Sequence, residues 1–149
     1  MNTLNPKWDN RFIDMAQLVA SWSKDPTTKV GAVVVNDNRQ ILAVGYNGFP
    51  RGVHDDPERL NVRPVKHIFT AHAERNALDS ALTDLRGATI YSTLCPCNEC
   101  AKSIIQRGIT RVVAGMYKDE QQKQIFNYND TLLMFHEAGV TIDLIEKIY

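Results

Sequence analysis

The sequence predicts an α/β fold of three layers, in which helices cover both faces of a mixed five-stranded sheet. Five short apolar segments, rich in β-branched residues, have the length and composition of strands. The first two are joined by the polar turn Asn36-Asp37-Asn38, which predicts an antiparallel hairpin. The later strands alternate with helices, which predicts parallel neighbours joined by right-handed crossovers. The expected strands cover residues 30–35, 41–46, 88–94, 111–115 and 140–145.

Helix positions follow from the spacing of apolar residues and from residues that start or stop helices. Asn5-Pro6 is a typical helix start, and apolar residues then recur every three or four positions to about Ser23, before Asp25-Pro26. Further helices are expected at about 72–82, 97–107 and 130–137. Residues 51–68 are polar and without a clear period, so we expect a long loop that has a function.

Composition indicates one domain and favours a small molecule over a long nucleic acid as its partner. The 149 residues are 44% hydrophobic, so we expect a single domain over residues 1–149 with a continuous core. Lys and Arg total 17, as do Asp and Glu, and this balance argues against a long nucleic acid as the main partner. No apolar stretch approaches the ~20 residues of a membrane-spanning helix, and Met1–Trp8 lack the features of a secretion signal. We therefore expect a cytoplasmic protein.

Two short motifs, each at the start of an expected helix, together predict a metal site. The run His72–Glu74 begins one helix, and the run Pro96–Cys100 begins another. Cys97 and Cys100 lie on one face of a helical turn, where the helix N-terminus favours thiolates. One imidazole and two thiolates are typical ligands of a catalytic zinc, which keeps a fourth position for water and makes hydroxide available near neutral pH.

Glu74 is the expected proton carrier of this site. In a regular helix the side chains of His72 and Glu74 would diverge. We therefore expect His72 in the irregular first turn, where both side chains can face the metal. Glu74 can then hold the metal-bound water and carry its proton to a leaving amine.

Each motif alone has a simpler interpretation. Cys-x-x-Cys is also typical of a redox pair or of half a structural zinc knuckle, and His-Ala-Glu occurs by chance on helices. Cys95 lies at a strand end, outside the helical turn, and is expected to be a small buried apolar residue. His54, His67 and His136 are isolated and are expected to be surface or packing residues. In this order, however, the two motifs are the signature of zinc-dependent nucleobase deaminases.

Four segments together resemble the deoxycytidylate deaminase family, within the wider cytidine deaminase superfamily. The two metal motifs are shared across the superfamily, whereas Gly-Tyr-Asn-Gly-x-Pro and the ending Cys-Ala-Lys are typical of the deoxycytidylate branch. The resemblance extends over nearly the whole chain and implies a cytidine-deaminase-like fold. The segments that carry it are residues 30–35, 45–50, 72–77 and 96–102.

The resemblance also implies roles for individual residues. The implied site consists of the zinc ligands His72, Cys97 and Cys100, the proton shuttle Glu74, the Ala73 backbone on the base and the Asn47 amide on the sugar. Taken alone, Asn47 could equally be a simple turn residue. Tyr117, just after the fourth strand, is a further candidate for lining the pocket.

The implied activity is hydrolysis of deoxycytidine monophosphate (dCMP) to deoxyuridine monophosphate (dUMP) and ammonia. The family resemblance further implies a homo-oligomer, commonly a hexamer, activated by deoxycytidine triphosphate (dCTP) and inhibited by thymidine triphosphate (dTTP), with magnesium accompanying a triphosphate effector. Other substrates stay open: free cytidine, guanine, a modified dCMP or adenosine in transfer RNA. A non-catalytic nucleotide sensor and a structural zinc module are further alternatives, against which the glutamate and the three-ligand set argue.

Residues 51–68 depart from relatives that bind a second, structural zinc in this insert. The insert contains His54 but no cysteine, so a second zinc is not expected. Cationic residues here could contact a substrate phosphate, although scattered charge is also typical of a solvated loop. These residues are Arg51, Arg59, Arg63 and Lys66.

Overall fold

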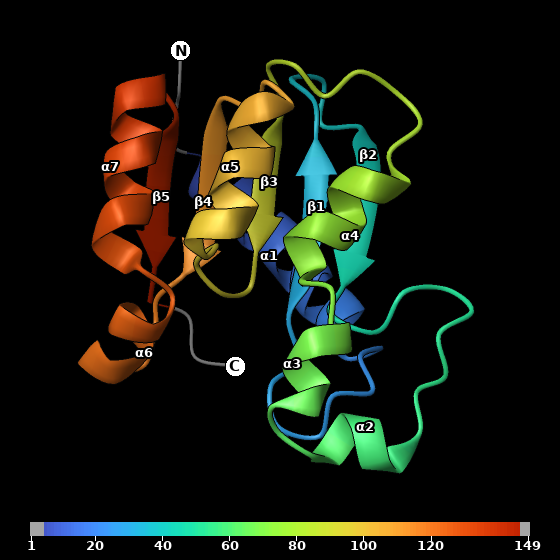
Figure 1. The fold of residues 1–149 in the computed structure, drawn as a ribbon. Coiled ribbons are helices and arrows are strands. Elements are labelled where there is room, and N and C mark those ends of the chain that lie inside the picture. Colours follow the sequence, from blue (N-terminus) through green and yellow to red (C-terminus); the bar gives the residue numbers. More distant parts are fainter. Residues whose placement is uncertain (1–4, 147–149) are drawn as a thin grey trace.

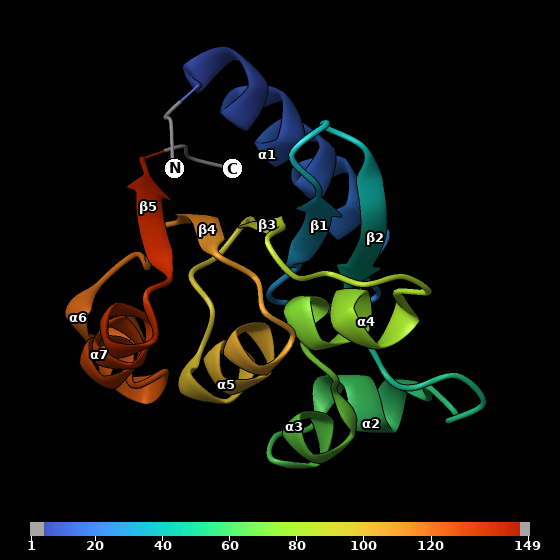
Figure 2. The same cartoon turned by 90° about the horizontal axis from the view of Figure 1, so that it is seen from above.

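The computed structural model describes residues 5–146, so residues 1–4 and 147–149 of the predicted domain lie outside the described part. One sheet carries α1 on one face and α4, α5 and α7 on the other (Figures 1 and 2). The predicted three-layer α/β fold with a mixed five-stranded sheet is confirmed. The strands are β1 (Gly31–Val35), β2 (Ile41–Tyr46), β3 (Thr89–Ser92), β4 (Arg111–Gly115) and β5 (Thr141–Ile145). The helices are α1 (Pro6–Ala20), α2 (Pro57–Asn61), α3 (Val65–Phe69), α4 (Ala73–Ser80), α5 (Asn98–Gln106), α6 (Glu120–Ile125) and α7 (Tyr128–Ala138).

The sheet has the strand order β2-β1-β3-β4-β5. Strand β1 pairs antiparallel with both β2 and β3, whereas β3, β4 and β5 are parallel to one another. The predicted hairpin and the predicted parallel neighbours are therefore both confirmed. Strands β1 and β4 are buried along their whole length because helices cover both of their faces, which explains their continuous apolar sequences.

Two apolar clusters fill the spaces between the layers. The smaller cluster lies under α1, where Phe12 and Ile13 belong to the same buried group as Val33 of β1. The larger cluster joins the sheet to α4, α5 and α7. Gly45 lets α4 lie directly on β2, since a Cβ there would be 2.3 Å from the backbone nitrogen of Ala77. This close approach fixes where α4 begins, and the first metal motif lies at that point.

Several predicted boundaries differ from the structure. The expected loop over residues 51–68 contains two short helices, α2 and α3, and helix α6 was not predicted. Helices of five or six residues are too short for an apolar stripe to repeat, and tertiary contacts stabilise them instead. The first helix ends at Ala20 instead of about Ser23. None of the described helices combines the length and the apolar character that a membrane crossing requires.

Candidate metal centre and substrate pocket

The two metal motifs meet because α4 and α5 are packed side by side on one face of the sheet (Figure 2). His72 is the N-cap residue of α4 and has extended backbone angles, so its expected place before the regular helix is confirmed. Cys97 is the N-cap residue of α5, and its sulfur accepts a hydrogen bond from the backbone nitrogen of Cys100 at 3.5 Å. Both helix N-termini therefore present their positive ends to the motif side chains.

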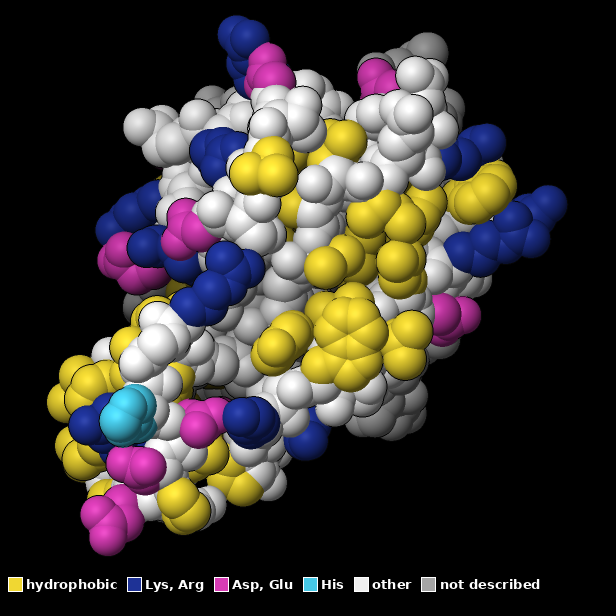
Figure 3. Space-filling model, turned by 90° about the vertical axis from the view of Figure 1, so that its right-hand side faces the viewer, with side chains coloured by type: hydrophobic (Ala, Val, Ile, Leu, Met, Phe, Trp, Pro, Cys, Tyr) yellow, Lys and Arg dark blue, Asp and Glu magenta, His cyan; other side chains and the backbone are white. Residues whose placement is uncertain are grey.

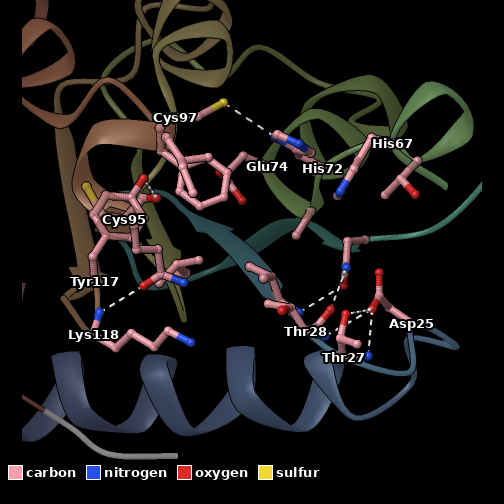
Figure 4. Close-up of a pocket in the computed structure, with 18 of the residues that line it drawn as sticks. Asp25, Thr27, Thr28, His67, His72, Glu74, Cys95, Cys97, Tyr117 and Lys118 are labelled. Carbon is pink, nitrogen blue, oxygen red and sulfur yellow. Dashed lines mark hydrogen bonds between the residues drawn. The ribbon is translucent and has the colours of Figure 1, made fainter. Parts of the chain in front are cut away.

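The three motif side chains have the spacing of a metal site. The His72 Nδ1 atom lies 3.4 Å from the Cys97 Sγ atom and 3.4 Å from the Cys100 Sγ atom. All three ligand atoms lie within 4.8 Å of one another. A tetrahedral zinc with ordinary bond lengths would separate sulfur from nitrogen by about 3.6 Å and sulfur from sulfur by about 3.8 Å. The donor set therefore fits zinc, and Figure 4 shows the His72 ring turned toward Cys97.

The electrostatics of the cluster favour a thiolate, the form of cysteine that binds zinc. Hydrogen bonds from the Cys100 thiol and from His72 outweigh the opposing effect of burial and lower the pKa of Cys97 to about 4. The hydrogen bond to Cys97, together with burial, raises the pKa of Cys100. The bond with Cys97 also raises the pKa of His72.

Glu74 and Cys95 are buried beside this cluster. Glu74 lies in the first turn of α4 with 4% of its surface exposed, and burial raises the pKa of its carboxyl group. A carboxyl group with a raised pKa suits proton transfer near neutral pH. Burial raises the pKa of Cys95 to about 12, and its thiol donates a hydrogen bond to the carbonyl of Pro96 at 3.7 Å. Cys95 is therefore the small buried residue that the sequence predicted.

The metal cluster opens into a cavity of about 520 Å³, within the usual size range of small-ligand sites. Three parts of the chain form its other walls: the segment before β1, helix α3, and the segment from Tyr117 through α6. In Figure 4, Asp25, Thr27 and Thr28 lie across the cavity from Cys97, and Tyr117 lies on a third side. Helix α6, which was not predicted, thus contributes part of the wall.

Three of the four expected substrate residues line this cavity, namely Asn47, Ala73 and Tyr117. The Asn47 amide accepts a hydrogen bond from the Val30 nitrogen and donates one to the Thr28 carbonyl, each at 2.8 Å. It therefore holds the segment before β1 in place. Arg51 does not line this cavity and belongs to a smaller neighbouring one of about 250 Å³.

Tyr117 is buried between the metal motif and α6. Its hydroxyl donates a hydrogen bond to the Cys95 carbonyl at 2.7 Å, and its ring stacks on Phe126 at 5.3 Å between centroids. These contacts connect the cavity wall to the segment that carries the cysteine ligands.

Charged side chains line the cavity wall that α3 and the preceding Arg63 form, called the α3 wall below. Lys66 is 4% exposed, and its Nζ atom lies 2.8 Å from a carboxylate oxygen of Asp25 and 2.6 Å from the Thr27 hydroxyl. The expectation of a solvated side chain is therefore wrong for Lys66. Arg63 and His67 line the cavity next to it, and His67 is exposed, as expected for a surface residue. A helix of five residues gives too little periodicity for its sequence to reveal which side chains face inward.

Comparisons with known proteins agree with this fold and this site. Residues 6–116 match the family model described as the cytidine and deoxycytidylate deaminase zinc-binding region. An uncharacterized deaminase in the luxG 3′ region of Aliivibrio fischeri is 44% identical over 141 residues, which cover 91% of this chain and 92% of that protein. Human deoxycytidylate deaminase is 41% identical over 143 residues, covering 91% of this chain and 78% of the human protein.

A solved structure has the same architecture. The dCMP deaminase from the cyanophage S-TIM5, in complex with dCMP and dUMP, superposes with a TM-score of 0.76 at 27% identity, covering 96% of this chain and 100% of that one. The fold and the zinc-binding motifs define a zinc-dependent deaminase. The chain belongs to the cytidine and deoxycytidylate deaminase family.

Proposed function

We propose that this protein hydrolyses dCMP to dUMP and ammonia, through one deaminase domain that spans residues 1–149. The observation that carries the proposal is the cluster of His72, Cys97 and Cys100 beside buried Glu74, on a cavity that has cationic groups on another wall. Relatives named deoxycytidylate deaminase, at about 40% identity, support this substrate.

The proposed chemistry depends on zinc held by His72, Cys97 and Cys100. When bound there, zinc supplies a Lewis acid that lowers the pKa of water to near neutrality. The carboxylate of Glu74 accepts a proton as water adds to the ring carbon that bears the amine. Glu74 delivers this proton to the ring nitrogen. It then takes the remaining proton from the hydroxyl group of the adduct and passes it to the departing amine, which leaves as ammonia. The net reaction consumes one water and requires no organic cofactor.

The remaining cavity residues orient the nucleotide. In the proposed complex the Ala73 backbone bonds the base, the Asn47 side chain lies at the sugar, and the Tyr117 ring forms a wall. Orientation of this kind raises the reaction rate because it holds the base in the correct geometry relative to the catalytic groups.

Arg63 and His67 are the proposed contacts of the substrate phosphate. Both line the cavity on the α3 wall, and the ion pair of Lys66 with Asp25 holds that wall against the segment before β1. Arginine binds phosphate through paired, charge-assisted hydrogen bonds. Arg51 lines the neighbouring cavity instead, so the phosphate proposal rests on Arg63.

Ammonia release across a panel of substrates tests the proposed function. The panel contains dCMP, deoxycytidine, cytidine, a methylated dCMP, dCTP, guanine and transfer RNA. We expect the highest kcat/KM with dCMP and a strong dependence on zinc. A higher kcat/KM with guanine or transfer RNA would assign the protein to another branch of the family.

We also propose a cytoplasmic homo-oligomer, as large as a hexamer, whose activity dCTP with magnesium raises and dTTP lowers. Exposed apolar side chains gather on the face beside the edge strand β2, as Figure 3 shows. Those on α1, near its end and on β2 are Leu18, Trp22, Ile41 and Tyr46, which are 41–58% exposed. Such a face supports association. Sedimentation of a fully active monomer at assay concentration would contradict this proposal.

A further inference from the structure

Ser92 places a hydroxyl group in the middle of the sheet. It is the last residue of β3, has 0% exposure, and lies between Ala32 of β1 and Ala114 of β4 in the strand register. Alternation along β3 puts Ser92 on the same face as Ile90, which belongs to the cluster under α4 and α5. A hydroxyl group in such an apolar layer is costly unless it forms a hydrogen bond.

The partner of this hydroxyl group is the carboxylate of Glu74. The Ser92 Oγ atom lies 3.4 Å from the Glu74 Oε1 atom, and both residues are buried. This distance exceeds the roughly 2.7 Å of an ordinary hydroxyl hydrogen bond. Hydrogen bonds of catalytic groups are often long in the ligand-free enzyme and shorten when substrate binds.

We propose that Ser92 is a positioning residue for the reaction, which fixes the rotation of the Glu74 carboxylate by donating a hydrogen bond to its Oε1 atom. The inference rests on the proposed function, because it concerns the group that carries protons. The terminal torsion of a glutamate has a broad energy profile, so packing alone leaves the carboxylate plane poorly defined. With Oε1 held by Ser92, the Oε2 atom is the one that exchanges protons with water and with the base.

Replacement of Ser92 tests this role through a split between kcat and KM. We expect Ser92→Ala to lower kcat with dCMP about tenfold, since the proton carrier stays but loses its orientation, while KM and zinc content stay unchanged. Ser92→Thr keeps the hydroxyl group beside two alanines and should restore most of kcat. Full kcat in Ser92→Ala, or an equal loss in both variants, would overturn the proposal.

Thr131→Val is the matched control. Thr131 of α7 is also 0% exposed, and its hydroxyl has no hydrogen-bond partner among the described residues. Removing this hydroxyl should leave kcat unchanged. A loss of kcat equal to that of Ser92→Ala would mean that any change to a buried hydroxyl disturbs the enzyme, and would overturn a specific role for Ser92.

A double-mutant cycle in urea unfolding tests the contact without using activity. Ser92→Ala should lower the unfolding midpoint when Glu74 is present, because the buried carboxyl group loses one of its hydrogen bonds. In the Glu74→Ala background the same change should not lower it, since the serine hydroxyl then has no partner to lose. Equal lowering in both backgrounds would overturn the inference. Because this cycle needs no turnover, it separates failure of the Ser92 contact from failure of the proposed function.

Discussion

Two walls of the cavity are built in different ways. The metal wall carries His72, Glu74 and Cys97, and the α3 wall carries Arg63, Lys66 and His67. On the metal wall, each motif residue lies at or within the first turn of α4 or α5, and both helices rest on the sheet. On the α3 wall, the contact between Lys66 and Asp25 joins residues 41 positions apart, and each of the two insert helices has five residues. Ligand geometry that depends on local spacing can therefore be predicted from a sequence. A binding wall that depends on contacts between distant residues cannot be predicted in this way.

The same contrast predicts how each wall responds to substitution. Loss of one metal ligand should release the zinc ion on which the proposed chemistry depends, so activity should disappear completely. Loss of one cationic group on the α3 wall removes one of several contacts, so the effect should be graded and should depend on the substrate's phosphate.

The largest expected effect is on the metal wall. Replacing His72, Cys97 or Cys100 by alanine should remove zinc and activity together, because three protein ligands are the minimum of a catalytic zinc site. Cys95→Ser is the control and should retain the metal, since its side chain lies outside the ligand cluster. Metal analysis of each purified variant checks both expectations, and loss of zinc from Cys95→Ser would show that the ligands are wrongly assigned.

A smaller, substrate-dependent effect is expected at Arg63. Arg63→Ala should lower kcat/KM for dCMP by about tenfold or more, the equivalent of one hydrogen bond to a charged group. The kcat/KM for deoxycytidine should not change, because that substrate has no phosphate. Initial rates with both substrates measure the ratio of kcat/KM for dCMP to kcat/KM for deoxycytidine.

Arg59→Ala is the matched control for Arg63. The Arg59 guanidinium lies 4.6 Å from the centre of the Phe69 ring, and the side chain does not line the cavity. Its loss should leave the preference for dCMP intact. If Arg63→Ala and Arg59→Ala both prefer dCMP over deoxycytidine as strongly as the unmodified protein does, the phosphate does not bind at Arg63.

The Asp25–Lys66 ion pair predicts a pH effect on stability. Burial alone raises the pKa of Asp25, but the hydrogen bonds from Lys66, Thr28 and Thr27 outweigh it and hold the pKa below the ordinary 3.8. The carboxylate therefore contributes stability above that pH and loses this contribution as the pH falls through the folded-state pKa. Asp25→Asn should lower the free energy of unfolding by about 3 kcal/mol at neutral pH, because Lys66 is left buried without its counter-charge.

The difference in unfolding free energy between the unmodified protein and Asp25→Asn should shrink as the pH falls below about 4. Urea unfolding at several pH values measures it, and contributions from zinc ligands cancel in the difference. Asp55→Asn, which removes the exposed partner of Lys24, should leave stability unchanged at every pH. A difference for Asp25→Asn that does not shrink at low pH would mean that the negative charge of Asp25 is not the source of the lost stability.

The parts of the molecule that sequence reasoning predicted are those with a local signal. The five strands followed from β-branched runs. The place of His72 before the regular helix followed from the need for His72 and Glu74 to face the same metal. The burial of Lys66 was missed because its partners Asp25 and Thr27 lie far away in the sequence. The role of Ser92 was missed because one serine in an apolar strand has no pattern, and only the fold reveals that α4 brings a carboxylate to it.

In the proposed reaction, Glu74 transfers protons, whereas His72, Cys97 and Cys100 hold the zinc. Glu74→Gln keeps the size of the side chain but cannot accept and return a proton. We expect single-turnover deamination of dCMP to fall at least ~10²-fold, while zinc content and dCMP binding in the same preparation stay near those of the unmodified protein. Full activity in this variant would eliminate Glu74 as the proton carrier, and loss of zinc would mean that Glu74 supports the metal site instead.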